Sequence, residues 1–144
     1  MDRPLARLDP ADPDGAWARE HLASEIVGWL TTVAPDGTPQ SSVVSFLWDG
    51  AEIVIYSRPE TSKVRNIAAN PRVAFNLQSD VYGDHMLSLE GMAVTDPALP
   101  PFDQDAAYMA KYRAPLAHWE MDEAATARDF SLAIRIRPTR IRAF

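Results

Sequence analysis

The chain has 144 residues, no cysteine and a formal net charge of −6. This length fits one domain, and 47% hydrophobic with 24% charged residues is typical of a folded globular chain. The missing cysteines exclude a disulfide scaffold, a thiolate metal site and a cysteine nucleophile. The acidic balance argues against nucleic-acid binding. No apolar run approaches the roughly 18–20 residues that a membrane span needs, so we expect no membrane partner.

The first 15 residues are predicted to be a flexible arm, because they are polar, acidic and contain three prolines. Their polarity predicts that they are not a signal peptide, and together with the lack of cysteine we expect a cytoplasmic protein. Trp17, His21, Leu22 and Ile26 then recur at the spacing of one helix face, which predicts a helix over 16–25 that Gly28 ends. Residues 16–144 are expected to form a single cofactor-binding domain.

Alternating and β-branched stretches follow, and two Asp-Gly pairs separate the first three of them. Asp36-Gly37 and Asp49-Gly50 are typical hairpin turns, because glycine accepts the positive φ of a tight turn. These turns predict an antiparallel meander of three consecutive strands. The predicted strands cover residues 29–34, 40–48, 52–57, 72–78, 85–95 and 131–137, with a last short strand over 140–144.

Two further helices are predicted between these strands. Thr61 or Ser62 can cap a short helix that Asn70-Pro71 stops near residue 69. A second helix covers residues 103–113, and more helix through Glu123 follows the interruption at Pro115. Six or seven short strands with two or three helices suggest a closed or nearly closed antiparallel barrel, since closure removes exposed strand edges that would pair with other chains.

Two short basic segments interrupt the acidic chain. Residues 58–72 contain four Lys or Arg against the single Glu60, a net charge of +3, and residues 128–144 contain five arginines against the single Asp129, a net charge of +4. A small anionic ligand needs such segments, whereas solvated basic faces are the alternative.

Several kinds of catalytic motif are absent. The six glycines form neither a dinucleotide fingerprint nor a phosphate loop, and no nucleophile-elbow pattern occurs. His21, His85 and His118 are isolated from one another and do not show metal-ligand spacing. We therefore predict no metal site, and we assign no catalytic residue.

Residues 55–65 carry the most informative chemistry, because a strand, a turn and a helix start follow one another. The helix N-terminus offers free amide donors, Ser57, Thr61 and Ser62 add hydroxyls, and Lys63 adds a charge. This combination can hold a phosphate. In the alternative interpretation, Thr61 and Ser62 only cap the helix while Lys63 faces water.

The strand over residues 40–47 is a second candidate, because Ser41 and Ser45 lie on one face and Ser42 on the other. Such a strand can lie beside a flat aromatic ring, or it can be an ordinary half-exposed strand. Trp48, Trp119 and Tyr112 are candidates for lining a pocket, although aromatic side chains mostly fill cores.

An ordered set of short motifs resembles the pyridoxamine 5′-phosphate oxidase-like proteins, and within them the branch that uses the deazaflavin coenzyme F420. The resemblance covers about residues 25–144 and continues through Glu90-Gly91, the helix around Tyr108–Tyr112 and the tail over 135–142. Its motifs are Trp29-Leu30-Thr31-Thr32-Val33, Pro35-Asp36-Gly37, Pro39-Gln40, Phe46-Leu47-Trp48-Asp49-Gly50, Ile55-Tyr56-Ser57, Lys63-Val64-Arg65-Asn66-Ile67 and Asn70-Pro71-Arg72-Val73-Ala74.

The resemblance implies a mainly β (α+β) fold, a split antiparallel β-barrel of six to seven strands with two to four flanking helices. It also implies a homodimer with a cofactor in each of two clefts at the subunit boundary. By position, Ser57, Ser62 and Lys63 would hold the cofactor phosphate. Arg140 or Arg142 would reach the anionic tail site of the neighbouring protomer. The backbone along the ring system would be that of Ser41, Ser42, Val43, Val44, Ser45 and Phe46.

The resemblance implies an oxidoreductase that passes a hydride from reduced coenzyme F420 to a small unsaturated or quinone-like substrate. The related oxidases that use flavin mononucleotide (FMN) typically have an arginine-lysine pair where this chain has Ser62-Lys63. An FMN-binding oxidase or flavin reductase, and a non-catalytic flavin or deazaflavin carrier, are the alternatives. A proton for the substrate could come from solvent or from Tyr56, Tyr82, Tyr108 or Tyr112.

Overall fold

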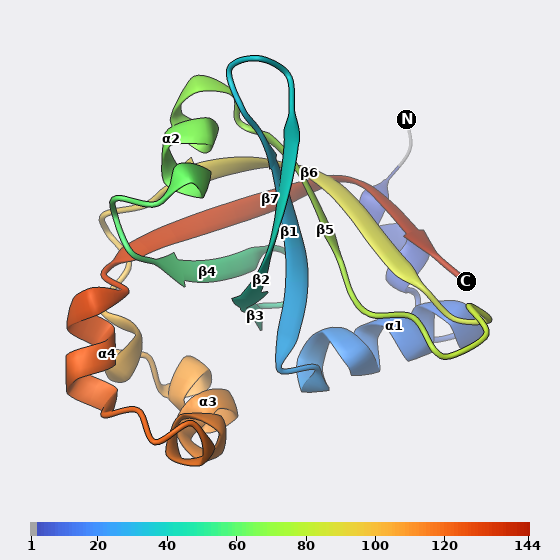
Figure 1. Ribbon diagram of the computed structural model, residues 1–144. Coiled ribbons are helices and arrows are strands. Elements are labelled where there is room, and N and C mark those ends of the chain that lie inside the picture. The colour runs from blue at the N-terminus through green and yellow to red at the C-terminus, as the bar shows by residue number, and fades with distance from the viewer. Residues whose placement is uncertain (1–2) are drawn as a thin grey trace.

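The computed structural model of the protein describes residues 3–144, and Figure 1 shows its arrangement. Seven strands form one sheet, and α-helices and two short 3-10 helices (η) lie around it. None of the helices within residues 3–144 is long and apolar enough to cross a membrane. The elements in chain order are η1 (Pro4–Leu8), α1 (Pro13–Ser24), β1 (Val27–Val33), β2 (Pro39–Ser45), β3 (Leu47–Trp48), β4 (Ile53–Ser57), α2 (Ser62–Ala69), β5 (Arg72–Asn76), β6 (Leu87–Thr95), η2 (Phe102–Gln104), α3 (Ala106–His118), α4 (Glu123–Asp129) and β7 (Leu132–Ala143).

The sheet curls into a split barrel. Its strand order is β2-β1-β5-β6-β7-β4-β3, and every neighbouring pair is antiparallel. The two edge strands, β2 and β3, follow one another in the chain and are separated only by Phe46. The chain therefore passes from one edge of the sheet to the other at Phe46, which forms a corner of the barrel. This architecture confirms the predicted mainly β fold.

The predicted three-strand meander is wrong in one respect, because residues 40–48 do not form one strand. The chain breaks at Phe46, so that β2 pairs with β1 and β3 pairs with β4. The Phe46 side chain is fully buried, and its N–H donates to the hydroxyl of Tyr112 instead of to a neighbouring strand. The Asp-Gly turns themselves are present, with φ of 88° at Gly37 and 98° at Gly50.

The C-terminal strand differs from the prediction of two short strands. β7 continues through Pro138 because the register with β6 shifts there: Gly91 pairs with Pro138, whereas Glu90 pairs with Arg140. The extra residue, Thr139, forms a β-bulge and donates its hydroxyl to the carbonyl of Glu90. A bulge tolerates proline because it interrupts the regular ladder of hydrogen bonds.

The N-terminal segment is more structured than the expected flexible arm, within the described residues. Pro4–Leu8 form η1, Leu8 is buried, and α1 begins at Pro13 instead of residue 16. The carboxylate of Asp12 caps α1 by accepting from the N–H of Asp14. Met1 and Asp2 lie outside the described residues.

The helices after β6 also extend beyond their predicted ends. α3 continues past Pro115 to His118, and α4 is a separate helix that the carboxylate of Asp122 caps. The helix continues across the proline because Tyr112, before the proline, and Leu116, after it, are both buried in the same group of side chains as Val54 and Tyr56 of β4. α3 and α4 lie together beside β4 (Figure 1).

Two groups of buried apolar side chains lie on opposite faces of β4. Ile53 and Ile55 point into the barrel, while Val54 and Tyr56 point toward α3 and α4. The barrel cluster consists of Leu8, Ala18, Leu22, Leu30, Val44, Phe46, Ile53, Ile55, Ile67, Val73, Phe75, Leu77, Leu87, Leu89, Ala93, Ile134, Ile136 and Ile141. The pocket cluster consists of Val54, Tyr56, Phe102, Tyr108, Met109, Tyr112, Leu116, Ala127 and Ala133.

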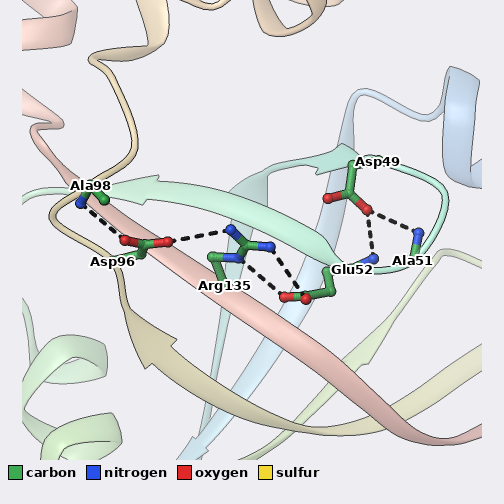
Figure 2. A network of polar contacts seen from close by, with 6 residues as sticks. All are labelled: Asp49, Ala51, Glu52, Asp96, Ala98 and Arg135. Atoms are coloured by element: carbon green, nitrogen blue, oxygen red, sulfur yellow. Dashed lines mark hydrogen bonds and ion pairs between the residues drawn. The ribbon is translucent and has the colours of Figure 1, made fainter.

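An ion-pair network joins β7 to the residue before β4 and the residue after β6 (Figure 2). Arg135 of β7 donates to both carboxylate oxygens of Glu52, at 3.2 and 3.3 Å, and to Asp96 at 3.3 Å. The carboxylate of Asp49 accepts from the N–H groups of Ala51 and Glu52, which holds the turn that carries Glu52. Arg135 is therefore neutralised by two acids, so the basic tail is less free to hold an anion than the sequence indicates.

Candidate functional site

The turn between β4 and α2 is held by its own hydroxyl groups. Ser57 is 2% exposed and donates its hydroxyl to the carbonyl of Arg58 at 2.9 Å. The hydroxyl of Thr61 donates to the same carbonyl at 3.2 Å and lies 3.1 Å from the Ser57 hydroxyl. These contacts fix where α2 begins. Because the Ser57 hydroxyl donates its hydrogen to Arg58, only its lone pairs are left to accept a hydrogen bond from a ligand.

A buried asparagine fixes α2 against the sheet. Asn66 is 4% exposed, and its side-chain amide donates to the hydroxyl of Thr32 on β1 and to the side-chain oxygen of Gln40 on β2. A buried amide needs such partners, because an unpaired polar group in the interior is costly. The N-terminal turn of α2, with Ser62 and Lys63, is thereby held opposite β2.

A polar groove lies between β2 and the start of α2, with a volume of about 670 Å³. It carries two cations, Lys63 and Arg65, and one acid, Glu60. No carboxylate within residues 3–144 forms an ion pair with Lys63. Burial lowers the pKa of Lys63, and a bound anion would offset that effect. The groove is lined by Thr32, Gln40, Ser41, Ser42, Glu60, Thr61, Ser62, Lys63 and Arg65.

A second cavity, the apolar pocket, adjoins the groove and has a volume of about 260 Å³. Thr61 and Lys63 line both spaces, so the two are neighbours at these residues. α3, α4 and the segment between them cover the pocket, with Trp119 and Met121 partly exposed. Its lining residues are Val43, Val44, Ser45, Ile55, Tyr56, Ser57, Arg58, Thr61, Lys63, Phe102, Tyr108, Tyr112, Leu116, Trp119, Met121, Thr126 and Phe130.

α3 is attached to the corner between β2 and β3 by two polar side chains. The hydroxyl of Tyr112 lies 2.9 Å from the carbonyl of Phe46 and 2.5 Å from the carbonyl of Ile26, and it accepts from the N–H of Phe46 at 2.8 Å. The ammonium of Lys111 donates to the Phe46 carbonyl at 2.9 Å and lies 3.8 Å from the centre of the Phe46 ring. This attachment positions the wall of the apolar pocket.

The structure brings most of the predicted cofactor residues together. Ser41, Ser42, Ser62 and Lys63 line the groove, and Val43, Val44, Ser45 and Ser57 line the pocket with Lys63. The other two predicted residues lie elsewhere. The backbone N–H and carbonyl of Phe46 are bonded to α3. Arg142 lines a separate hollow with Arg7 and Arg140. Within one protomer, Arg142 is therefore not part of the groove.

Much of the pocket wall was not predicted from the sequence. Of the three predicted aromatic residues, Trp119 and Tyr112 line the pocket, but Trp48 packs against the barrel cluster instead. Tyr108, Leu116 and Phe102 were not identified as lining residues. The spacing of four between Tyr108 and Tyr112 was the available signal, because it puts both rings on one helix face, where they stack at 4.7 Å.

Comparison with known families identifies the family of this chain. Residues 16–144 match the model of the Pyridoxamine 5'-phosphate oxidase family, and the chain belongs to this family. None of the curated proteins matches the chain.

Solved structures agree with this assignment. An F420 reductase is 30% identical, with a TM-score of 0.67 over 86% of this chain and 94% of that chain. An FAD-binding protein from Mesorhizobium loti is 19% identical, with a TM-score of 0.63 over 89% and 91% of the two chains. The heme storage protein HutZ from Vibrio cholerae is 15% identical, with a TM-score of 0.63 over 91% and 93%. The latter two are similar in fold alone.

Proposed function

We propose that the protein binds coenzyme F420 and transfers a hydride from its reduced form to a small unsaturated or quinone-like substrate. The observation that carries this proposal is that a cationic groove and an apolar pocket share Lys63 and Thr61 as lining residues. The anionic tail of a deazaflavin coenzyme needs a cationic space, and a small apolar substrate needs a second space beside the flat ring. The similarity to an F420 reductase supports the same choice.

The residues of the groove fit the anionic tail of the coenzyme. Lys63 has no ion-pair partner among the described residues, and Ser41, Ser42 and Ser62 line the same space. The hydroxyl of Ser41 is also bonded to the hydroxyl of Thr31 at 2.8 Å. Ammonium and hydroxyl groups are donors for phosphate and carboxylate oxygens. With a net charge of −6 on the chain, such a local cation is needed to attract the ligand.

The edge of β2 fits the ring system. β2 is the first strand of the sheet, so its backbone is unpaired on the side away from β1. An unpaired strand edge offers N–H and C=O groups in a row, which suits the polar edge of a flat ring beside Val43 and Ser45. When bound, reduced F420 supplies the hydride. The chain binds and orients the coenzyme and the substrate, and α3 with α4 covers the pocket.

We further propose a homodimer, in which Arg140 or Arg142 reaches the tail site of the second protomer. Val27, Trp29 and Val43 support a contact at the outer face of β1 and β2, since each is at least 40% exposed and Trp29 pairs with Val43. Analytical ultracentrifugation tests the assembly: a monomer at micromolar concentration would contradict it. A dimer in which Arg142→Gln leaves F420 affinity unchanged would remove Arg142 from the site.

Titration of the purified protein with F420, followed by the fluorescence of the deazaflavin ring, tests the proposed cofactor. FMN is titrated in parallel, and tighter binding of FMN would favour the alternative of a flavin enzyme. Lys63→Gln is expected to weaken F420 binding about tenfold or more, since a hydrogen bond to a charged group contributes about 1.5–3 kcal/mol.

Arg19→Gln is the matched control, because it removes the same charge from an exposed position on α1. It is expected to change the affinity for F420 less than twofold. Equal effects of the two substitutions would mean that Lys63 does not contact the coenzyme. Binding without reduction of any enone or quinone would indicate a carrier and contradict the proposed activity.

A further inference from the structure

Three tyrosines meet in the apolar pocket, and only one of them has a free hydroxyl. Tyr56 comes from β4, and Tyr108 and Tyr112 come from α3. The ring of Tyr108 is at the centre of the group, 5.1 Å from the ring of Tyr56 and 4.7 Å from that of Tyr112. Phe102 lies 5.2 Å away on a further side. This aromatic wall accepts flat apolar molecules.

The hydroxyls of the two outer tyrosines are used by the protein itself. Tyr56 donates to the carbonyl of Pro100 at 2.8 Å, and Tyr112 is bonded to the main chain of Ile26 and Phe46. These bonds hold α3 and the segment before it against the sheet. The fourth tyrosine of the chain, Tyr82, is 89% exposed in the segment between β5 and β6.

Tyr108 is different, because it is only 4% exposed and no hydrogen bond joins its hydroxyl to any residue within 3–144. Its main-chain N–H is bonded to the carboxylate of Asp105, but the phenol lines the pocket without a partner. Among the described residues, the only fully buried side-chain nitrogen or oxygen atom without a hydrogen-bond partner is Nδ1 of His85, so the Tyr108 hydroxyl is accessible from the pocket that Tyr108 lines. A ligand carbonyl in the pocket would accept the hydrogen bond that this hydroxyl does not donate within the protein.

We propose that the apolar pocket holds the substrate, a flat, uncharged ring compound with a conjugated carbonyl, and that the hydroxyl of Tyr108 donates a hydrogen bond to that carbonyl oxygen. The proposal rests on the proposed function and names its substrate site. The volume of about 260 Å³ fits a compound of one or two rings. The lining is largely aromatic and aliphatic, so a carbonyl oxygen is the part of such a compound that needs a polar partner.

The same hydrogen bond assists the reduction. A hydride from reduced F420 forms a new C–H bond at the conjugated carbon. The electron pair of the carbon–carbon π bond moves toward the carbonyl oxygen, and a proton from solvent completes the two-electron reduction of the substrate. A donor placed at that oxygen stabilises the developing negative charge. Burial raises the pKa of Tyr108, so the phenol keeps its proton and acts as a donor.

Binding of 1,4-naphthoquinone and of naphthalene, measured by isothermal titration calorimetry without coenzyme, tests the proposal. The two probes share the ring system, and only the quinone has carbonyls; the chain has no thiol with which the quinone could react. Tyr108→Phe is expected to weaken quinone binding about three- to tenfold, the usual range for one neutral hydrogen bond. Naphthalene binding is expected to stay within twofold. Tyr82→Phe is the control and should change neither.

An unchanged quinone affinity in Tyr108→Phe, or an equal loss for both probes, would overturn the proposal. Leu116→Trp is a second variant, because it fills the pocket from another residue of α3. It should weaken both probes at least tenfold, and unchanged binding would place the probes elsewhere.

Titration with F420 distinguishes the two proposals. Tyr108→Phe should bind F420 as the unsubstituted protein does. If F420 does not bind at all while the quinone still depends on Tyr108, the pocket assignment stands and the proposed function fails. If F420 binds but the quinone does not depend on Tyr108, the proposed function stands and the pocket assignment fails.

Discussion

The barrel cluster and the pocket cluster share β4 but differ in chemistry. The barrel cluster consists of aliphatic side chains with Phe46 and Phe75, and it contains no tyrosine. The pocket cluster contains three tyrosines and borders a cavity. An interior without polar atoms packs tightly and specifies one structure. The comparison shows that one strand can supply a packed core on one face and part of a cavity wall on the other, although Val44 and Ile55 of the barrel cluster also line the cavity.

Phe75 gives the largest expected loss of stability. Its ring is fully buried, meets Phe46 edge-to-face at 4.9 Å and lies directly against Gly28. Phe75→Ala is expected to lower the free energy of unfolding by about 3–5 kcal/mol, because it leaves a cavity in the barrel cluster. Urea denaturation followed by tryptophan fluorescence measures this loss. Val81→Ala, at a 92% exposed position, is the control with an expected loss under about 0.5 kcal/mol.

Tyr112→Phe is expected to have the next largest effect. It removes the hydroxyl that bonds α3 to Ile26 and Phe46, and it leaves the buried N–H of Phe46 without this acceptor. We expect a loss of about 1–3 kcal/mol, measured in the same denaturation experiment. A loss as small as that of Val81→Ala would mean that these hydrogen bonds do not hold the pocket wall.

Stability is expected to depend on pH through the attachment of α3. Burial raises the pKa of Tyr112 to about 12, so between about pH 10 and 12 only the unfolded chain loses this proton, and stability falls as pH rises. Burial lowers the pKa of Lys111 to about 8, so from about pH 8 to 10.5 only the unfolded chain keeps that proton, and stability rises with pH.

The free energy of unfolding should therefore peak near pH 10, with slopes of at most about 1.4 kcal/mol per pH unit for each proton. Denaturation at pH 7, 10 and 12 measures the two slopes. Lys111→Met should reduce the rise, with a smaller part left to Lys63, whose pKa burial also lowers, and Tyr112→Phe should reduce the fall. A curve that is flat from pH 8 to 12 would contradict both assignments.

Tyr108→Phe should have the smallest effect on stability. Its hydroxyl has no hydrogen bond to lose within the described residues, so the free energy of unfolding should change by less than about 0.5 kcal/mol or rise slightly. Tyr112→Phe removes the same group, a phenol hydroxyl, from the same helix, so the two losses of stability are directly comparable. A loss as large as that of Tyr112→Phe would show that the Tyr108 hydroxyl serves the fold and not a ligand.

Local patterns were enough to predict most strands and their turns. Asp36-Gly37 and Asp49-Gly50 specify tight turns on their own, since glycine adopts the positive φ required. The break at Phe46 could not be predicted, because it depends on Tyr112, which lies 66 residues away in the chain. The bulge at Thr139 likewise depends on the pairing of β7 with β6.

The sequence indicates more of the residues that line the groove than of those that line the pocket. Ser62 and Lys63 stand at a helix start that the sequence indicates directly, and the resemblance suggests the role of Ser41 and Ser42. The pocket wall depends on how α3 packs on β4, and helix periodicity alone does not say which partner a helix face meets. That Tyr108 lacks a hydrogen-bond partner is visible only in three dimensions.

The long strand β7 lies between β6 and β4 and is their only connection in the sheet. Before β7 pairs, β2-β1-β5-β6 and β4-β3 are two separate sheets, and Ser57 lacks its partner Leu132. During synthesis on the ribosome, both sheets emerge before the strand that joins them. The barrel is therefore closed only after β7 has emerged, and cleavage ahead of β7 is expected to separate the two sheets that carry the candidate site.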